Sequence, residues 1–99
     1  ALIEKDTVVI ALATQPSVAQ KTISNILETV ARGAEVILIA SQSQNTEGFE
    51  YVIRIPDVDP LLSCIPATVL LQELAYYVAK EKGCDVDKPR NLAKSVTVE

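Results

Sequence analysis

Two short apolar runs separated by an amphipathic stretch constrain the fold of this 99-residue chain more than any other feature. Residues 7–13 (TVVIALA) and 36–40 (VILIA) are rich in β-branched residues and lack a polar face. Such runs are typical of strands that are covered on both sides in a parallel sheet. Strand, helix and strand within about thirty residues predict a right-handed βαβ unit, and therefore an α/β fold.

The helix between these strands is predicted to begin near Ser17 and to end before Gly33. Ser17 followed by Gln20 has the form of a capping box, which satisfies the first helical N–H groups. Gly33 suits the left-handed residue that ends many helices. The apolar positions that recur at helical spacing are Val18, Ile23, Ile26, Leu27, Val30 and Ala31.

A third strand is predicted at residues 51–55, where Arg54 indicates a partly exposed face and an edge position. Residues 41–50 show no helical pattern and form a short connection for a parallel crossover. Asp59 and Pro60 then have the pattern of an N-cap followed by proline at the first helical position. The helix that follows is apolar over most of its surface up to Gly83, and Pro66 should kink it or split off its first turn.

Composition limits the classes of partner. The chain is 48% hydrophobic and 22% charged, as globular domains are, and its net charge is −4. Lys and Arg are spread singly, so no basic cluster exists to neutralise nucleic-acid phosphates. We find no apolar run long enough to cross a bilayer and no signal peptide. The sequence therefore predicts a soluble, cytoplasmic protein with neither a nucleic-acid nor a membrane partner.

The two cysteines, Cys64 and Cys84, stand apart in a chain without histidine. Zinc sites need about four ligands, so this set argues against a metal centre. We expect buried or partly exposed free thiols, which fits a cytosolic location, and no cofactor. Tyr76 and Tyr77 could form a stacking platform, but without a basic groove they are better interpreted as core or interface residues.

The last residues, 85–99, read DVDKPRNLAKSVTVE and have no helical apolar period. By composition they are typical of a fraying terminus. Their sequence, however, resembles the C-terminal end of the glutamine–fructose-6-phosphate aminotransferase (isomerising) family, also called glucosamine-6-phosphate synthase. A weaker similarity to the second sugar isomerase (SIS) domain of that family runs back to the start of the chain.

The resemblance implies a fold and a reaction. The fold would be a three-layer, SIS-type (flavodoxin-like) parallel sheet flanked by helices and present only in part. Residues 1–83 would form the C-terminal portion of an SIS domain, and residues 84–99 a tail that closes the sugar-phosphate site. The family converts fructose 6-phosphate and glutamine to glucosamine 6-phosphate and glutamate, and a separate N-terminal domain releases the ammonia.

The resemblance also implies roles for four residues of the tail. Lys94 would act in ring opening or as a Schiff base, and the backbone of Ala93 would contact the sugar. Leu92 and Val96 would help to wall the ammonia passage. A lysine amine attacks a carbonyl only when it is unprotonated, which requires a pKa lowered from about 10.4, for example by poorly hydrated surroundings.

Other groups that the family reaction needs are missing from this chain. The catalytic Glu and His, the glutaminase Cys and the phosphate-binding serines of the first SIS domain would all lie upstream. The chain also lacks methionine, so we interpret it as a piece of a longer polypeptide that extends on the N-terminal side. We expect the piece alone to be catalytically silent.

The polar segment 41–48 follows a strand, where open α/β sheets bind ligands, and its Ser41-Gln42-Ser43 is similar to the phosphate loop of SIS domains. Gln44 stands where that loop has glycine and no helical pattern follows, which favours a surface loop. Two alternative functions remain open, a regulatory SIS module that binds a sugar phosphate and a dimerisation piece. Because three strands and two helices leave the sheet partly uncovered, we also predict a homo-oligomer.

Overall fold

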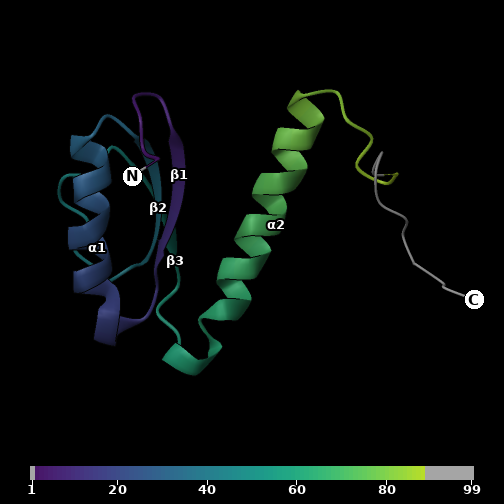
Figure 1. The fold of residues 1–99 in the computed structure, drawn as a ribbon. Helices are drawn as coiled ribbons and strands as arrows, with labels where there is room; N and C mark the ends of the chain where they lie inside the picture. Colours follow the sequence, from purple (N-terminus) through teal and green to yellow (C-terminus); the bar gives the residue numbers. More distant parts are fainter. Residues whose placement is uncertain (1, 89–99) are drawn as a thin grey trace, which may run out of the picture. The chain divides into compact units, whose positions relative to one another are not determined.

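A computed structural model of the chain describes residues 2–88, and Figure 1 shows its fold. The described part of the chain falls into two compact units, one ending at Ala67 and one beginning at Thr68. The predicted boundary between residues 83 and 84 stays a prediction. The elements in order are β1 (Val8–Ala13), α1 (Pro16–Ala31), β2 (Glu35–Ser41), β3 (Tyr51–Ile55), a 3-10 turn η1 (Pro60–Leu62) and α2 (Cys64–Glu81).

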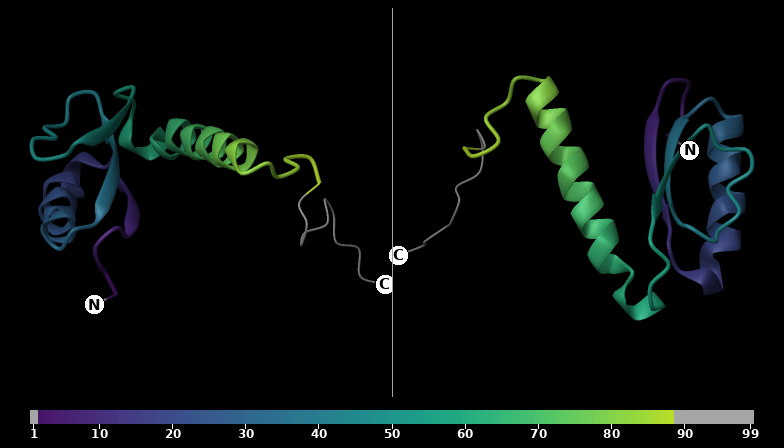
Figure 2. Two further views of the ribbon diagram at one scale, coloured as in Figure 1. Left: turned by 90° about the horizontal axis from the view of Figure 1, so that it is seen from above. Right: turned by 180° about the vertical axis from the view of Figure 1, so that it is seen from behind.

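The three strands form one parallel sheet in the order β1-β2-β3, seen from two further sides in Figure 2. Ala11 of β1 pairs with Leu38 of β2, and Leu38 pairs with Val52 of β3. The α/β class, the βαβ unit and the parallel third strand at a sheet edge are therefore confirmed. Each predicted strand agrees with the observed one to within a residue at either end.

The core lies between α1 and one face of the sheet (Figure 1). Strand residues alternate between the two faces, so every second residue of β1 and β2 points toward α1. Leu38, on the central strand, has no exposed surface. The buried residues of this core are Ala11, Ala13, Ala19, Ile23, Ala34, Val36, Leu38 and Ala40.

The connection from β2 to β3 replaces a crossover helix. It returns along the same face of the sheet as α1 (Figure 2), and Phe49 packs against the core cluster. Gly48 has a φ of +93°, and a β-carbon there would lie 3.1 Å from Cδ2 of Leu27 on α1. A glycine in a left-handed conformation thus lets a short loop approach the helix closely and close a parallel connection.

Replacing Gly48 with alanine should lower the free energy of unfolding by about 1–3 kcal/mol, because a side chain would add backbone strain and a contact with Leu27. Gly83→Ala is the matched control. Gly83 has a φ of +73° but no atom within 4 Å of an added β-carbon, so only the strain, about 1 kcal/mol, should appear. Urea unfolding followed by circular dichroism measures both, and equal losses would contradict close packing of the loop on α1.

The start of α1 corrects one expectation. The helix begins at Pro16 with Gln15 as N-cap, and no side chain caps it, so the predicted Ser17–Gln20 capping box is wrong. Pro16 accounts for the difference, since its fixed φ suits the first helical position and it has no N–H to satisfy. The predicted end is confirmed: Gly33 has a φ of +91°, and its N–H donates to the Val30 carbonyl at 2.9 Å.

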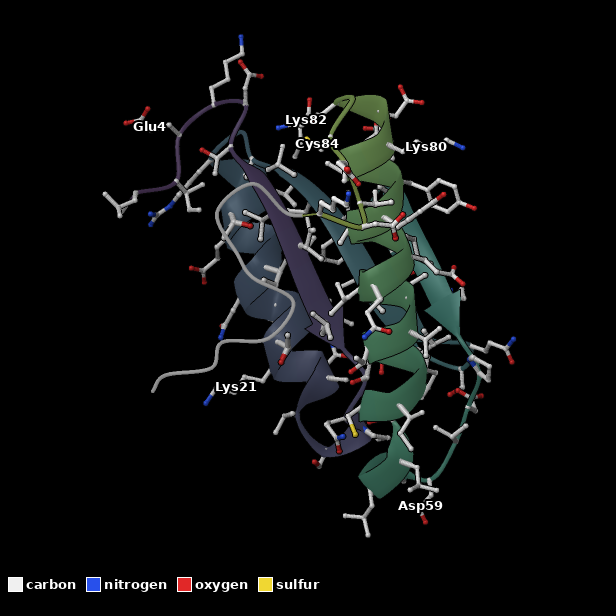
Figure 3. All side chains as sticks on the ribbon, turned by 90° about the vertical axis from the view of Figure 1, so that its right-hand side faces the viewer. Glu4, Lys21, Asp59, Lys80, Lys82 and Cys84 are labelled. Carbon is white, nitrogen blue, oxygen red and sulfur yellow. The ribbon has the colours of Figure 1, made fainter. Side chains whose placement is uncertain are left out.

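The C-terminal helix begins and ends as predicted. Asp59 caps η1 by accepting a hydrogen bond from the Leu61 N–H at 2.9 Å, and Figure 3 labels it at that end. Pro66 lies near the start of α2, and the first turn is split off as η1. Past the other end, Gly83 has a φ of +73° and the Cys84 N–H donates to the Ala79 carbonyl at 2.9 Å.

The segment from η1 through α2 corrects a second expectation. The 22-residue segment Pro60–Glu81 contains an 18-residue window with a mean hydropathy of 1.4, and it is long and apolar enough to cross a membrane by length and composition alone. The prediction that no such run exists was therefore wrong. Core helices of globular proteins share these properties, and Glu73 lies near the middle of the segment, where lipid would disfavour a carboxylate.

Candidate functional site

The carboxyl ends of the three parallel strands meet at one edge of the sheet, where ligands of open α/β sheets bind. A pocket of 210 Å³ lies there, within the unit that ends at Ala67. The segments that follow β1, β2 and β3 form its walls. Its lining residues are Thr14, Pro16, Ser41, Ser43, Ile55, Pro56, Asp57, Val58, Pro60 and Ser63.

Arg54 of β3 holds the polar loop beside this pocket. Its Nη1 donates to the carbonyls of Ser41 at 2.9 Å and Gln44 at 2.5 Å, and its Nη2 donates to Oγ1 of Thr46 at 2.6 Å. Three hydrogen bonds from one guanidinium group hold the loop in place at Ser41, Gln44 and Thr46. Both terminal nitrogens of the guanidinium group thus donate to oxygens of the chain itself.

Asp57 lies beside the Ser41-Gln42-Ser43 segment and lines the same pocket. Its Oδ1 accepts hydrogen bonds from the Ser43 N–H at 3.2 Å and from the Ser43 hydroxyl at 3.1 Å. These two donors of the Ser41-Gln42-Ser43 segment are thus engaged, and a carboxylate beside them repels an anion. The contacts support the interpretation of residues 41–48 as a surface loop.

Gln15, between β1 and α1, ties the pocket to the start of α2. Its side-chain amide donates to the Pro60 carbonyl at 2.8 Å and to the Ser63 hydroxyl at 2.7 Å. Ser63 is 3% exposed, and its hydroxyl donates in turn to the Pro60 carbonyl at 2.9 Å. The polar groups of the pocket therefore bond mainly to one another, as expected of a structural joint.

Substituting lysine for Arg54 should loosen the loop while leaving the sheet intact. A single ammonium lacks the planar fork that reaches Ser41, Gln44 and Thr46 together. We expect faster hydrogen exchange of the loop amides at 42–47 and no change in β2. Arg32→Lys is the control, because the Arg32 side chain makes no hydrogen bond among residues 2–88. If the loop amides of Arg54→Lys exchange at the original rate, the hydrogen bonds of Arg54 are not needed to hold the loop.

Other reactive groups add little to this site. Cys64 and Cys84 are free and exposed. Tyr76 and Tyr77 form an edge-to-face pair with centroids 5.4 Å apart, and both are about half exposed, so the interpretation as core residues is not supported. Among residues 2–88, no group of three or more His, Cys, Asp or Glu side chains could hold a metal ion.

The four site residues predicted from the sequence, Leu92, Ala93, Lys94 and Val96, lie outside the described residues. The described chain leads into that segment through a turn in which Oδ1 of Asp85 accepts from the N–H groups of Asp87, at 2.9 Å, and Lys88, at 3.2 Å. Sequence reasoning missed the hydrogen bonds that Arg54 and Asp57 make to the 41–48 loop. An arginine inside an apolar strand, followed by an aspartate just past it, was the available signal.

No family model matches the chain. Its full length is 54% identical, over 101 residues, to the glutamine–fructose-6-phosphate aminotransferase (isomerising) of Clostridium acetobutylicum and 55% identical, over 101 residues, to that of Caldanaerobacter subterraneus subsp. tengcongensis. The enzyme of Methanosarcina acetivorans is 46% identical over 101 residues. The chain spans 17% of the first two relatives and 16% of the third.

A solved structure agrees with the sequence similarity. The C-terminal domain of glucosamine-fructose-6-phosphate aminotransferase from Francisella tularensis matches 88% of this chain with a TM-score of 0.77 and 30% identity. The chain covers 25% of that domain. The parallel sheet with its two helices is thus the fold of one part of a larger domain.

Proposed function

We propose that this chain, whose whole length is similar to glutamine–fructose-6-phosphate aminotransferase and which has the fold of part of that enzyme's C-terminal domain, works as one portion of its sugar isomerase half. The observation that carries the proposal is the similarity over the whole length of the chain. In this role the chain helps to convert fructose 6-phosphate and glutamine to glucosamine 6-phosphate and glutamate.

The chemical contribution of the chain is assigned to Lys94. In ring-opened fructose 6-phosphate, its uncharged Nζ adds to the C2 carbonyl and water leaves, which forms an imine. Ammonia then exchanges with the lysine amine, which returns to its free form. This role requires the uncharged form of the Lys94 amine, because a protonated amine cannot attack a carbonyl.

Three neighbours of Lys94 assist this chemistry. The backbone of Ala93 contacts the sugar, and Leu92 and Val96 line the passage that delivers ammonia. The proton transfer between adjacent carbons needs an acid–base pair from outside this chain, which contains no histidine. The isolated chain is accordingly inactive. The two free cysteines fit a reducing, cytoplasmic location.

The alternative of a regulatory sugar-phosphate module has little support in the strand-end pocket. Arg54 and the donors of Ser43 are occupied by the chain itself, and Asp57 disfavours an anion there. A dimerisation role has more support, because several large apolar side chains of β1 and β3 are exposed. We include self-association of the complete enzyme in the proposal.

Borohydride trapping tests the assignment of Lys94. The experiment uses a chimera in which this chain replaces the matching segment of the C. acetobutylicum enzyme, to which it is 54% identical. Incubation with fructose 6-phosphate and borohydride should add the mass of the reduced sugar phosphate to Lys94, as read by peptide mass spectrometry. The same chimera without sugar, and Lys94→Ala with sugar, are the controls. An active chimera that gives no adduct at Lys94 would rule out a Schiff base at this residue.

A further inference from the structure

The chain leaves the sheet through a short segment that one distant side chain holds in place. We call residues 59–67 the η1 link, because they lead from β3 into α2 and belong to the unit that contains the sheet. The backbone hydrogen bonds within the η1 link are local, such as that from the Leu62 N–H to the Asp59 carbonyl at 2.8 Å. Among residues 2–88, Gln15 is the one residue outside the η1 link whose side chain hydrogen-bonds to it.

Both N–H groups of the Gln15 amide are used in this contact. Its nitrogen donates to two oxygens, the Pro60 carbonyl at 2.8 Å and the Ser63 hydroxyl at 2.7 Å. The Ser63 hydroxyl donates in turn to the Pro60 carbonyl at 2.9 Å, which closes a network of three groups. Because the Pro60 carbonyl can only accept, the nitrogen of the amide and not its oxygen must face it. Two bonds to one amide fix both the position and the orientation of the η1 link.

Burial makes the network sensitive to a change at Gln15. Ser63 and Ala67 of the η1 link are each 3% exposed. A buried hydroxyl that loses a hydrogen-bond partner is costly, since water does not reach it freely. A glutamate at position 15 would have the shape of glutamine, but its carboxylate would place an acceptor against the Pro60 carbonyl oxygen. The η1 link would then have to shift.

The segment to which the chemistry is assigned follows the η1 link along the chain. α2 has 18 residues and is therefore about 27 Å long. A rotation of about 5° at one end of a rod of this length moves its other end by about 2 Å. Lys94 lies beyond that end in the sequence. Misplacement of a reacting group by about 1 Å can cost about a hundredfold in rate, even when its cause lies far from the reaction.

We propose that Gln15 is a positioning residue for Lys94, because it fixes where the η1 link leaves the sheet and in which direction. This inference rests on the proposed function, which assigns the reacting amine to Lys94. In this role Gln15 acts through the η1 link and does not itself contact the sugar. Its loss should therefore slow the step at Lys94, while the affinity for the sugar phosphate and the hydrolysis of glutamine stay unchanged.

The test compares Gln15→Glu and Gln15→Ala with the parent chimera described above. In both variants kcat for glucosamine 6-phosphate formation should fall about tenfold to a hundredfold. KM for fructose 6-phosphate should stay within about twofold, and glutamine hydrolysis should be unchanged. The borohydride adduct at Lys94 should form more slowly by the same factor as kcat. Gln20→Ala is the matched control, because Gln20 is exposed on α1 and its side chain makes no hydrogen bond among residues 2–88.

Three results would overturn the proposal. An unchanged kcat in Gln15→Glu would show that the reaction does not depend on these hydrogen bonds. A higher KM with the original kcat would assign the effect to sugar binding. An equal loss of both activities, with a lower melting temperature, would leave Gln15 a structural role only.

Hydrogen exchange in the isolated 99-residue chain tests the η1 link without the reaction. Gln15→Glu should speed exchange of the Leu62, Ser63 and Ala67 amides at least about tenfold and leave β2 unchanged. Unchanged exchange at these three amides would overturn the proposal, whether or not the chimera is active. Full activity of Lys94→Ala, or an inactive parent chimera, would instead count against the proposed function.

Discussion

Replacing Lys94 with alanine in the chimera is expected to lower glucosamine 6-phosphate formation at least about a thousandfold, as loss of a covalent nucleophile does. The only other lysine of residues 84–99 is Lys88. Glutamine hydrolysis should continue, because a separate domain performs it in the proposed enzyme. Parallel assays of glucosamine 6-phosphate and of glutamate released from glutamine show whether the first activity is lost while the second is kept.

Two further variants separate nucleophilic attack from charge. Lys94→Arg keeps the positive charge but has no deprotonated nitrogen to attack a carbonyl, so it should be as inactive as Lys94→Ala. Lys88→Ala removes a neighbouring exposed amine at the start of the tail and should leave both activities unchanged. Substantial product formation by Lys94→Arg would rule out imine formation at this residue and leave it an electrostatic role only.

Most of the fold could be predicted from the sequence because it depends on local periodicity. The β-branched runs around Val9 and Ile37 and the helical apolar spacing of α1 set the βαβ unit, and Gly33 set the end of its helix. The start of α1 was misplaced since two local signals competed, and the proline at position 16 prevailed over Ser17. Local pattern also gave no reason for a short parallel connection, which depends on Gly48 lying against α1.

The candidate site could be predicted only in part. Lys94 emerged from the resemblance of a short terminal motif, and nothing in its local composition distinguishes it from a solvated lysine. The hydrogen bonds around the strand-end pocket could not be predicted from the sequence for another reason. Arg54 meets Ser41, and Gln15 meets Ser63, across 13 and 48 positions of the chain, and only the assembled sheet brings these groups together.

Leu38→Ala should destabilise the unit that contains the sheet by about 2–5 kcal/mol, the usual cost of a core cavity. Leu38 has no exposed surface and lies on the central strand, where it faces α1 between the paired residues Ala11 and Val52. Its neighbours Ala11 and Ala40 are too small to fill the space that a lost isopropyl group would leave. Urea unfolding should therefore show a lower midpoint with an unchanged slope.

Leu61→Ala is the matched control for this prediction, because it removes the same group from a side chain that is 87% exposed on η1. Its effect should stay within about 0.5 kcal/mol in the isolated chain. The difference between the two variants measures how much of the stability comes from packing against α1, since both delete identical atoms. Equal effects would mean that α1 does not pack on the sheet in solution.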